Sequence, residues 1–283
     1  KIKGATLFLT IEEKTNDADN YYLSLNSCVK DNNEGNVLTD LSYQFSKSIN
    51  SDTLTLSGIL QDSYTLNPLK KAWVMLFDEG LNDSLIFKTT PNYIAKTNND
   101  GSFLFPNLNK KNYKITAITG FDFIYNKEEK IAFSNNIISA EKDSFISLFA
   151  FDPIIKADSI IQESTTLKSD SSINSEIDTI IQKQEFSYGK LKIICPNNNN
   201  SIFQLLQDEK VILDTFFSKK PYIITNIFPG KYQLKHIADT NQDSVWNTGN
   251  WGQRTLPEKV VNYPSEITIR SNWDLELEWI IEE

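Results

Sequence analysis

The chain has 283 residues, enough for two or three domains that each bury a core of their own. Its 28 basic residues are outnumbered by 37 acidic ones, and the lysines stand singly or in pairs among acids. Binding to nucleic acid needs clustered Lys and Arg, so we expect no nucleic-acid partner. No apolar run approaches the roughly 20 residues of a membrane-spanning helix. Two cysteines, Cys28 and Cys195, and one histidine argue against a structural zinc site.

Residues 1–50 show a strand pattern. In YYLSLNSCV, beginning at Tyr21, alternate residues fall on opposite faces, which is typical of a half-buried strand. A DNNEGN turn and a closing strand, LSYQFS, follow. Three strands make too small a core to stand alone, so we interpret this segment as the last part of a sandwich. The Tyr-opened strand, the turn and the Phe45-Ser46 ending resemble the C-terminal half of a bacterial Ig-like domain.

Residues 53–152 predict a complete β-sandwich. A first strand is followed by a turn around Asn67-Pro68 and a second strand from Ala72 to Phe77, and Asp100-Gly101 is a hairpin signal. The series resembles the carboxypeptidase-regulatory-like, or prealbumin-like, β-sandwich. That resemblance implies a fold and no activity, because this fold serves many unrelated proteins. The residues that carry it are Gly58, Asp62, Thr65, Pro68, Leu69, Ala72, Val74, Thr97, Asp100, Gly101, Phe103, Phe105, Asn107, Leu108, Tyr113, Ile115 and Ala117.

A weak internal repeat predicts a second, degenerate sandwich of the same kind in residues 188–283. In both Phe103–Glu129 and Ile223–Asn250 an apolar run ends in Asn-Leu or Asn-Ile, and after a turn a Tyr opens an alternating strand that leads into a polar loop. The last predicted strand, WDLELEWII, places two Trp and two Leu on one face and three acids on the other. We expect its apolar face, which includes Trp273 and Trp279, to cover the core, and its acids to blunt edge-to-edge pairing. The predicted fold class is therefore all-β, with tandem β-sandwiches.

Residues 153–187 form the predicted linker. The segment is rich in Ser, Thr, Asp, Glu, Ile and Lys. It contains no Gly, and no aromatic residue before Phe186. Isoleucines are unusual in a solvated linker, so a pair of short edge strands around Ile160 and Ile180 is kept as the alternative.

An oxygen-rich loop after the last predicted repeat is the candidate metal site. Asp239-Thr240-Asn241-Gln242-Asp243 has the alternating oxygen ligands of a calcium loop, and two further asparagines stand at the ninth and twelfth positions. Ser244 replaces the expected Gly, and a bidentate Glu is missing. The alternative is that the side chains cap their own turn. The candidate calcium ligands are Asp239, Asn241, Asp243, Asn247 and Asn250.

No pattern of catalytic residues stands out. His236 is the only histidine, without a patterned Ser or Cys nucleophile, and the paired acids are adjacent in sequence, so we expect no enzyme. Trp246 and Trp251 are candidates for stacking on sugar rings. The alternative for the four tryptophans near the C-terminus is two core residues and two that pack on the loop.

The Ig-like segment, the sandwich opening and the ending together resemble Bacteroidota Ig-like-domain-containing envelope lipoproteins. The ending carries the pattern W-x-TG, R-x-x-PEKV, YP and NWDLE between Trp246 and Glu276. The resemblance implies an exported, outer-membrane-associated protein tethered by a lipid upstream of this chain, with no activity to carry over and no cofactor except the candidate calcium.

From this resemblance we expect a structural or interaction subunit of the bacterial envelope. It would dock to a membrane protein complex for assembly, secretion or transport through exposed strand edges and the Trp-rich C-terminal unit. The alternative is a carbohydrate-binding or adhesion module of the cell surface.

Overall fold

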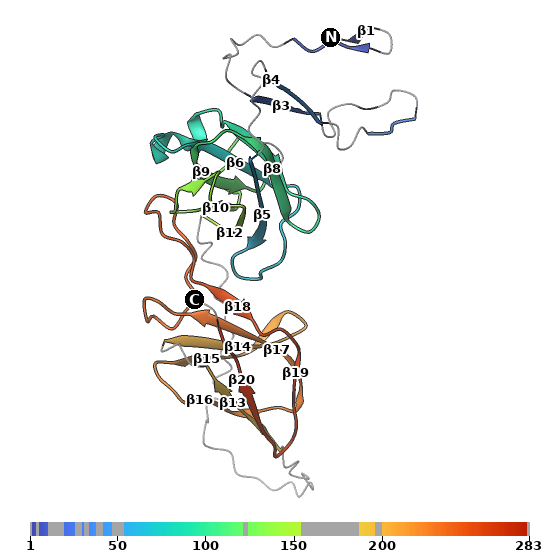
Figure 1. The fold of residues 1–283 in the computed structure, drawn as a ribbon. Coiled ribbons are helices and arrows are strands. Elements are labelled where there is room, and N and C mark those ends of the chain that lie inside the picture. Colours follow the sequence, from blue (N-terminus) through green and yellow to red (C-terminus); the bar gives the residue numbers. More distant parts are fainter. Residues whose placement is uncertain are drawn as a thin grey trace, which may run out of the picture. The chain divides into compact units, whose positions relative to one another are not determined.

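The computed structural model describes residues 2–3, 6–10, 20–25, 30, 34–37, 42–46, 54–120, 124–153, 187–195 and 200–281. Regular structure in these ranges is almost entirely β, which confirms the all-β prediction (Figure 1). One short 3₁₀ helix, η1 (Asp83–Lys88), is the exception, and the described part of the chain holds no apolar helix long enough to cross a membrane. Most of the predicted linker, residues 154–186, and Cys28 lie outside the described residues.

The chain forms two compact units. The first contains residues 1–60, 68–124 and 133–148, and the second contains residues 61–67, 125–132 and 149–283. Near the N-terminus, β1 (Ile2–Lys3) pairs with β2 (Thr6–Leu7), and β3 (Asn20–Ser24) pairs with β4 (Ser42–Ser46), each antiparallel. The β3–β4 pair joins the two strands predicted on either side of the DNNEGN turn.

The middle part of the chain builds two sheets. One has the order β12-β5-β8, and the other has the order β10-β9-β6-β7 with β11 also paired to β9. Buried residues alternate along β5, as a strand with one face on a core requires. The strands are β5 (Leu54–Asp62), β6 (Trp73–Asp78), β7 (Tyr93–Lys96), β8 (Ser102–Leu108), β9 (Asn112–Ile118), β10 (Ile131–Phe133), β11 (Ile138–Ser139) and β12 (Phe145–Ala150).

Asp62, at the end of β5, holds the following turn. Its Oδ1 accepts hydrogen bonds from the backbone N–H groups of Tyr64 (3.0 Å) and Thr65 (2.8 Å). Its Oδ2 lies 2.7 Å from the ammonium of Lys130, which also contacts Asp152 at 3.1 Å. Burial alone raises the pKa of Asp62, but Lys130 and the two N–H donors outweigh it and hold the pKa below its ordinary value. The Asp in the sandwich signature is therefore a structural residue.

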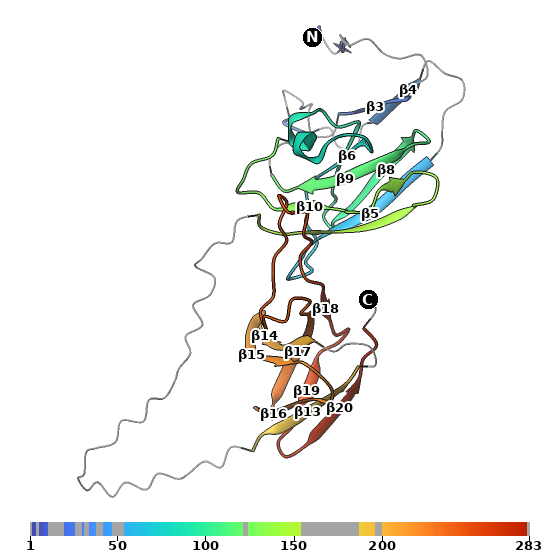
Figure 2. The same ribbon diagram turned by 90° about the vertical axis from the view of Figure 1, so that its left-hand side faces the viewer.

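The C-terminal part also builds two sheets (Figure 2). Their aliphatic and aromatic side chains form one core. One sheet has the order β16-β13-β20, and the other has the order β15-β14-β17-β18 with β19 also paired to β17. The pairing of β13 with β20 is parallel. The strands are β13 (Gly189–Ile194), β14 (Ser201–Gln207), β15 (Lys210–Phe217), β16 (Tyr222–Ile227), β17 (Gly230–Ala238), β18 (Val260–Asn262), β19 (Ile267–Ile269) and β20 (Asp274–Glu278).

The sequence repeat is also a repeat of local structure. Asn107 and Asn226 both adopt left-handed backbone conformations, with φ of 56° and 59°. Asn tolerates this conformation better than most residues do. Six positions later, Tyr113 donates its hydroxyl hydrogen to the carbonyl of Asn109 (3.1 Å), and Tyr232 does the same to the carbonyl of Phe228 (2.9 Å). The same Asn and Tyr contacts therefore shape corresponding turns in the two sandwiches.

The prediction for the last strand is correct except at its first residue. Trp279 is 6% exposed and lies in the core, and Leu275 and Leu277 pack against that core. Trp273 is 59% exposed, so its predicted place in the core is wrong. The period-two pattern fails there because β20 begins at Asp274, and Trp273 belongs to the preceding turn.

Candidate functional site

The loop after β17 is held by the buried carboxylate of Asp239. Its Oδ1 accepts hydrogen bonds from the N–H groups of Gln242 (2.7 Å) and Asp243 (3.3 Å), and its Oδ2 accepts one from the N–H of Ser244 (2.9 Å). Gln242 and Ser244 both have positive φ, at 63° and 66°. The Asp239 side chain thus accepts hydrogen bonds from three backbone N–H groups of a tight loop. This matches the alternative to calcium binding, in which the side chains cap their own turn.

Three more of the predicted ligands lie together on the same loop. Asp243 accepts hydrogen bonds through Oδ2 from the side-chain amides of Asn241 (2.9 Å) and Asn247 (2.7 Å), and through Oδ1 from the N–H of Val245 (2.9 Å). The Val245 N–H and the two amides lower the pKa of Asp243. Asp239, Asn241, Asp243 and Asn247 are therefore brought together as the sequence suggested, and their oxygens accept hydrogen bonds from the loop itself.

The fifth predicted ligand lies in a different turn. The Oδ1 of Asn250 accepts a hydrogen bond from the N–H of Gln253 (3.0 Å), and the backbone of Asn250 pairs with Thr255. Glu258, which sequence reasoning missed, instead reaches into the loop. Its buried carboxylate accepts hydrogen bonds from the N–H groups of Thr240 (2.7 Å) and Asn247 (3.1 Å). Its position, nineteen residues after Asp239, gave no sequence signal for this role.

A cation would need several of these oxygens at once. Within the described ranges, no group of three or more His, Cys, Asp or Glu side chains has an arrangement that could hold a metal ion. Calcium takes six to eight oxygens, and here the Asp239 and Asp243 carboxylates are used by N–H donors. Calcium binding at Asp239, Asn241, Asp243, Asn247 and Asn250 stays a prediction, while the hydrogen bonds support the capping role.

The two candidate sugar-binding tryptophans are both half-buried. Trp246 is half-buried against the small cluster of Ile202, Ile237 and Val260, and its indole N–H donates to the backbone carbonyl of Glu258 at 3.1 Å. Trp251 is also half-buried, and the guanidinium of Arg254 lies 4.3 Å from the centre of its ring. Stacking by Arg covers part of the ring surface that a sugar would use.

His236 and Ser201 form a buried pair that the sequence did not indicate. The register of β14 and β17 places Phe203 opposite His236, and this pairing brings His236 Nε2 within 3.0 Å of Ser201 Oγ. Both residues are buried, so no substrate can reach the serine oxygen. Burial, together with the charge of Lys259, lowers the pKa of His236 to about 4, so the imidazole is neutral at neutral pH. The geometry therefore assigns this pair a packing role.

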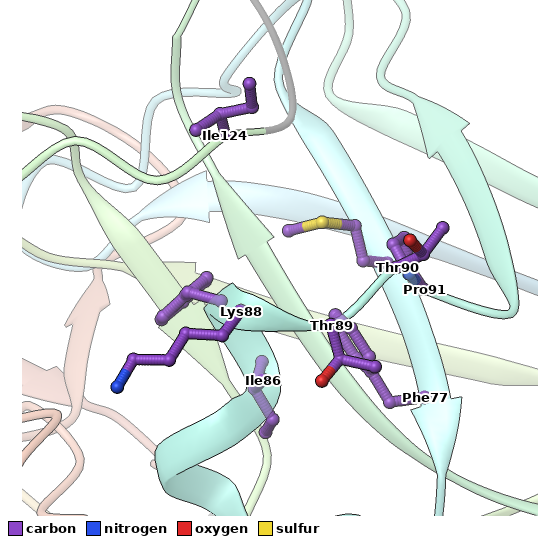
Figure 3. A pocket seen from close by; sticks show the side chains of 9 residues that line it. Phe77, Ile86, Lys88, Thr89, Thr90, Pro91 and Ile124 are labelled. Carbon is purple, nitrogen blue, oxygen red and sulfur yellow. The ribbon is translucent and has the colours of Figure 1, made fainter.

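The middle sandwich contains a small cavity of about 180 Å³ between β6 and η1 (Figure 3). Phe77 of β6, Ile86 of η1 and the Thr89–Pro91 segment line it, together with Ile124. Lys88 is the only ionisable residue among those described as lining it. A hollow of this size fits a side chain or a small group, and its lining residues lack the paired acid and base groups that general acid and base catalysis uses.

Comparison with known proteins gives only distant similarities. No family model matches the chain, and no curated protein matches it. Among solved structures, the minor pilin GBS52 of Streptococcus agalactiae is 12% identical, with a TM-score of 0.26 over 81% of this chain and 95% of the pilin. A DUF3823 family protein from Parabacteroides merdae is 10% identical, with a TM-score of 0.24 over 77% of this chain and 100% of the other. The shaft pilin SpaA from Lactobacillus rhamnosus is 6% identical, with a TM-score of 0.21 over 82% and 99%. Scores this low carry no argument about function.

Proposed function

We propose that this protein is a non-catalytic structural or interaction module of the bacterial cell envelope. In this proposal it is exported, associated with the outer membrane through a lipid upstream of this chain, and docked to a membrane protein complex for assembly, secretion or transport. The resemblance of its Ig-like segment and of its NWDLE ending to Bacteroidota envelope lipoproteins supports the location.

One observation carries the proposal: the polar groups that sequence or geometry single out serve the fold. Asp62, Asp239 and Glu258 hold turns and loops by accepting backbone N–H bonds. His236 and Ser201 are buried. Among the described strands, β15 and β20 stand at sheet margins, and β-sheet edges are surfaces on which proteins commonly bind extended segments of others.

The experiment is affinity purification of the tagged full-length protein from gently solubilised native membranes, followed by mass spectrometry. We expect a defined membrane protein complex to co-purify in reproducible stoichiometry. Recovery of the protein only as a free monomer would contradict the proposal. An untagged strain and a tagged, unrelated envelope protein serve as controls for carry-over.

The alternative is a carbohydrate-binding or adhesion module of the cell surface that uses Trp246 and Trp251. The half-buried state of both rings leaves part of their surface exposed, and this is the observation in its favour. Replacing both with Ala should then abolish retention on a glycan array while far-ultraviolet circular dichroism stays unchanged. A wild-type protein that no glycan on the array retains would eliminate this alternative.

A further inference from the structure

The strand β20 lies at one margin of the sheet β16-β13-β20, with β13 as its neighbour on one side (Figures 1 and 2). Two bonds fix which of its backbone groups face β13. The N–H of Lys190 donates to the carbonyl of Trp273 at 3.0 Å, and the N–H of Trp279 donates to the carbonyl of Ile194 at 2.9 Å. In a parallel pair, every second residue of a strand bonds to the neighbouring strand through its backbone. The backbone N–H and C=O groups of the odd-numbered residues in this segment therefore face β13. The backbone groups of Asp274, Glu276 and Glu278 therefore point away from β13, to an open edge where no strand among the described residues pairs with β20.

Acidic side chains of β20 form ion pairs with lysines of β13 at alternate positions along the two strands. Lys190 lies 2.9 Å from Asp274, and Lys192 lies 2.9 Å from Glu276. Glu278 is exposed, and the parallel register places the apolar Ile194 opposite it. Two of the three acids of β20 are thus paired with lysines of β13. The third, Glu278, lies opposite an apolar residue of that strand.

This charge pattern discriminates between possible partners of the edge. A second copy of β20, paired in either direction, would place acids of the two strands against each other, and like charges directly opposite are destabilising. A strand with Lys or Arg at alternate positions would instead meet Glu276 and Glu278 as β13 meets Asp274 and Glu276. Charge complementarity therefore favours a basic extended segment of another protein.

An exposed aromatic group stands at the start of the same edge. Trp273 is 59% exposed, while its backbone carbonyl is bonded to Lys190. The preceding turn packs so closely on β13 that a Cβ on Gly189 would lie 2.6 Å from the carbonyl oxygen of Arg270. Phe228, 52% exposed, lies edge-to-face with Tyr188 near the start of β13, with ring centres 5.0 Å apart. Exposed aromatic rings are frequent binding anchors, and their faces attract cations.

We propose that the open edge of β20, together with Trp273, binds an extended basic segment of a partner protein as an added strand. Backbone groups of Asp274, Glu276 and Glu278 pair with the segment, its alternate Lys or Arg side chains contact Glu276 and Glu278, and one of them lies over the indole of Trp273. The inference deepens the proposed function, on which it rests, by naming the chemistry of the partner.

The test uses the full chain and a fluorescent peptide of about nine residues that alternates valine and lysine, long enough to span β20. A peptide that alternates valine and glutamate is the charge control. We expect the basic peptide to bind at least about tenfold more tightly by fluorescence anisotropy. Hydrogen exchange measured by NMR should slow at the amides of Asp274, Glu276 and Glu278 when the basic peptide is bound. Equal binding of the two peptides, or protection at another edge, would overturn the proposal.

Two variants at position 276 separate the contribution of the backbone N–H to peptide binding from the contribution of the side-chain charge. Glu276→Pro removes an N–H that faces the open edge and leaves the bonds to β13 in place. Glu276→Gln removes only the charge, so it should weaken binding several-fold, whereas the Pro variant should abolish it. The unfolding midpoints of the two variants show whether Glu276→Pro is folded. If the midpoints are close and Glu276→Pro still binds the peptide as the wild type does, strand addition is refuted. Dimerisation of the wild type in sedimentation experiments that Glu276→Pro abolishes would assign the edge to a second copy instead.

The outcomes are independent of the membrane experiment. Peptide binding at β20 without a co-purified membrane complex would reject the proposed function and keep the edge as a binding site. A complex that co-purifies equally well with Glu276→Pro would support the function and reject β20 as its contact.

Discussion

The buried histidine predicts a specific loss of stability in mild acid. His236 is the only histidine in the chain, and burial lowers its pKa from an ordinary 6.5 to about 4 in the folded protein. Above pH 6.5 the imidazole is neutral in both the folded and the unfolded chain, so it does not affect the free energy of unfolding. As the pH falls from 6.5 to 4, the unfolded chain binds a proton that the folded chain does not. The free energy of unfolding therefore decreases across this window.

The size of the effect follows from the two pKa values. The full difference, between pH 6.5 and pH below 4, corresponds to about 3.4 kcal/mol at 1.36 kcal/mol per unit. At pH 5.5 the loss is about 1.4 kcal/mol, because the unfolded imidazole is then mostly protonated and the folded one is not. The physical cause is mainly burial: the rings of Phe203 and Trp279 lie against the imidazole, and the nearby charge of Lys259 adds to the effect.

The assay is urea unfolding at pH 7.5 and pH 5.5, for the wild type and for His236→Gln. Glutamine retains a group that can hydrogen bond to Ser201 but does not titrate, so the carboxylates contribute equally to both proteins. The wild type should lose about 1.4 kcal/mol more than the variant between the two pH values. A single imidazole resonance that titrates near pH 6.5 in the folded protein, or equal losses for the two proteins, would refute the reasoning.

Three further predictions concern contacts that hold the sandwiches. Lys130→Met removes the cation beside the mostly buried carboxylate of Asp62 and should cost about 1–3 kcal/mol in urea unfolding, while Lys190→Met breaks an exposed pair and should cost less than about 1 kcal/mol. Gly58→Ala places a Cβ 2.3 Å from the carbonyl oxygen of Ile146 and should cost about 3 kcal/mol, whereas Gly80→Ala meets no atom within 4 Å and should stay within about 0.5 kcal/mol. Asp239→Ala leaves three N–H groups without their acceptor and should cost about 2 kcal/mol. Millimolar calcium tests the ion site predicted from the sequence: a rise in the wild-type melting temperature that Asp239→Ala abolishes would establish the site, whereas an unchanged melting temperature would leave the capping role alone.

Turns and strand alternation depend on residues close together in the sequence, and these features could be predicted. The Asp100-Gly101 signal is a turn, in which Gly101 has a φ of 77° and Asp100 accepts the N–H of Ser102 at 3.0 Å. The predicted hairpin is wrong, because β7 and β8 on either side of this turn belong to different sheets. The alternation in the last strand placed Trp279 in the core correctly. Such features depend on backbone preferences and side-chain period, which a few consecutive residues determine.

Features that depend on long-range pairing could not be predicted. Glu258 enters the oxygen-rich loop from the far side, and Ser201 reaches His236 only because β14 lies beside β17. The parallel pairing of β20 with β13 joins residues 84 positions apart, and nothing local specifies it. The ligand pattern of the loop was visible in sequence, but the competing N–H donors were not, because backbone donors carry no sequence signal.

The acids of the last strand show how the structure changes the meaning of a pattern. In sequence, alternating Asp and Glu on a margin strand indicate protection against edge-to-edge pairing. The structure places Lys190 and Lys192 opposite Asp274 and Glu276, so the same acids stabilise pairing with a basic neighbour. A charge ladder that excludes its own copy and accepts a lysine-bearing strand is selective. The backbone groups of the same three acidic residues point to the side of β20 on which no described strand pairs with it. Charge selectivity and backbone groups that face away from β13 therefore occur together, and for this reason β20 is the edge where a partner should be sought first.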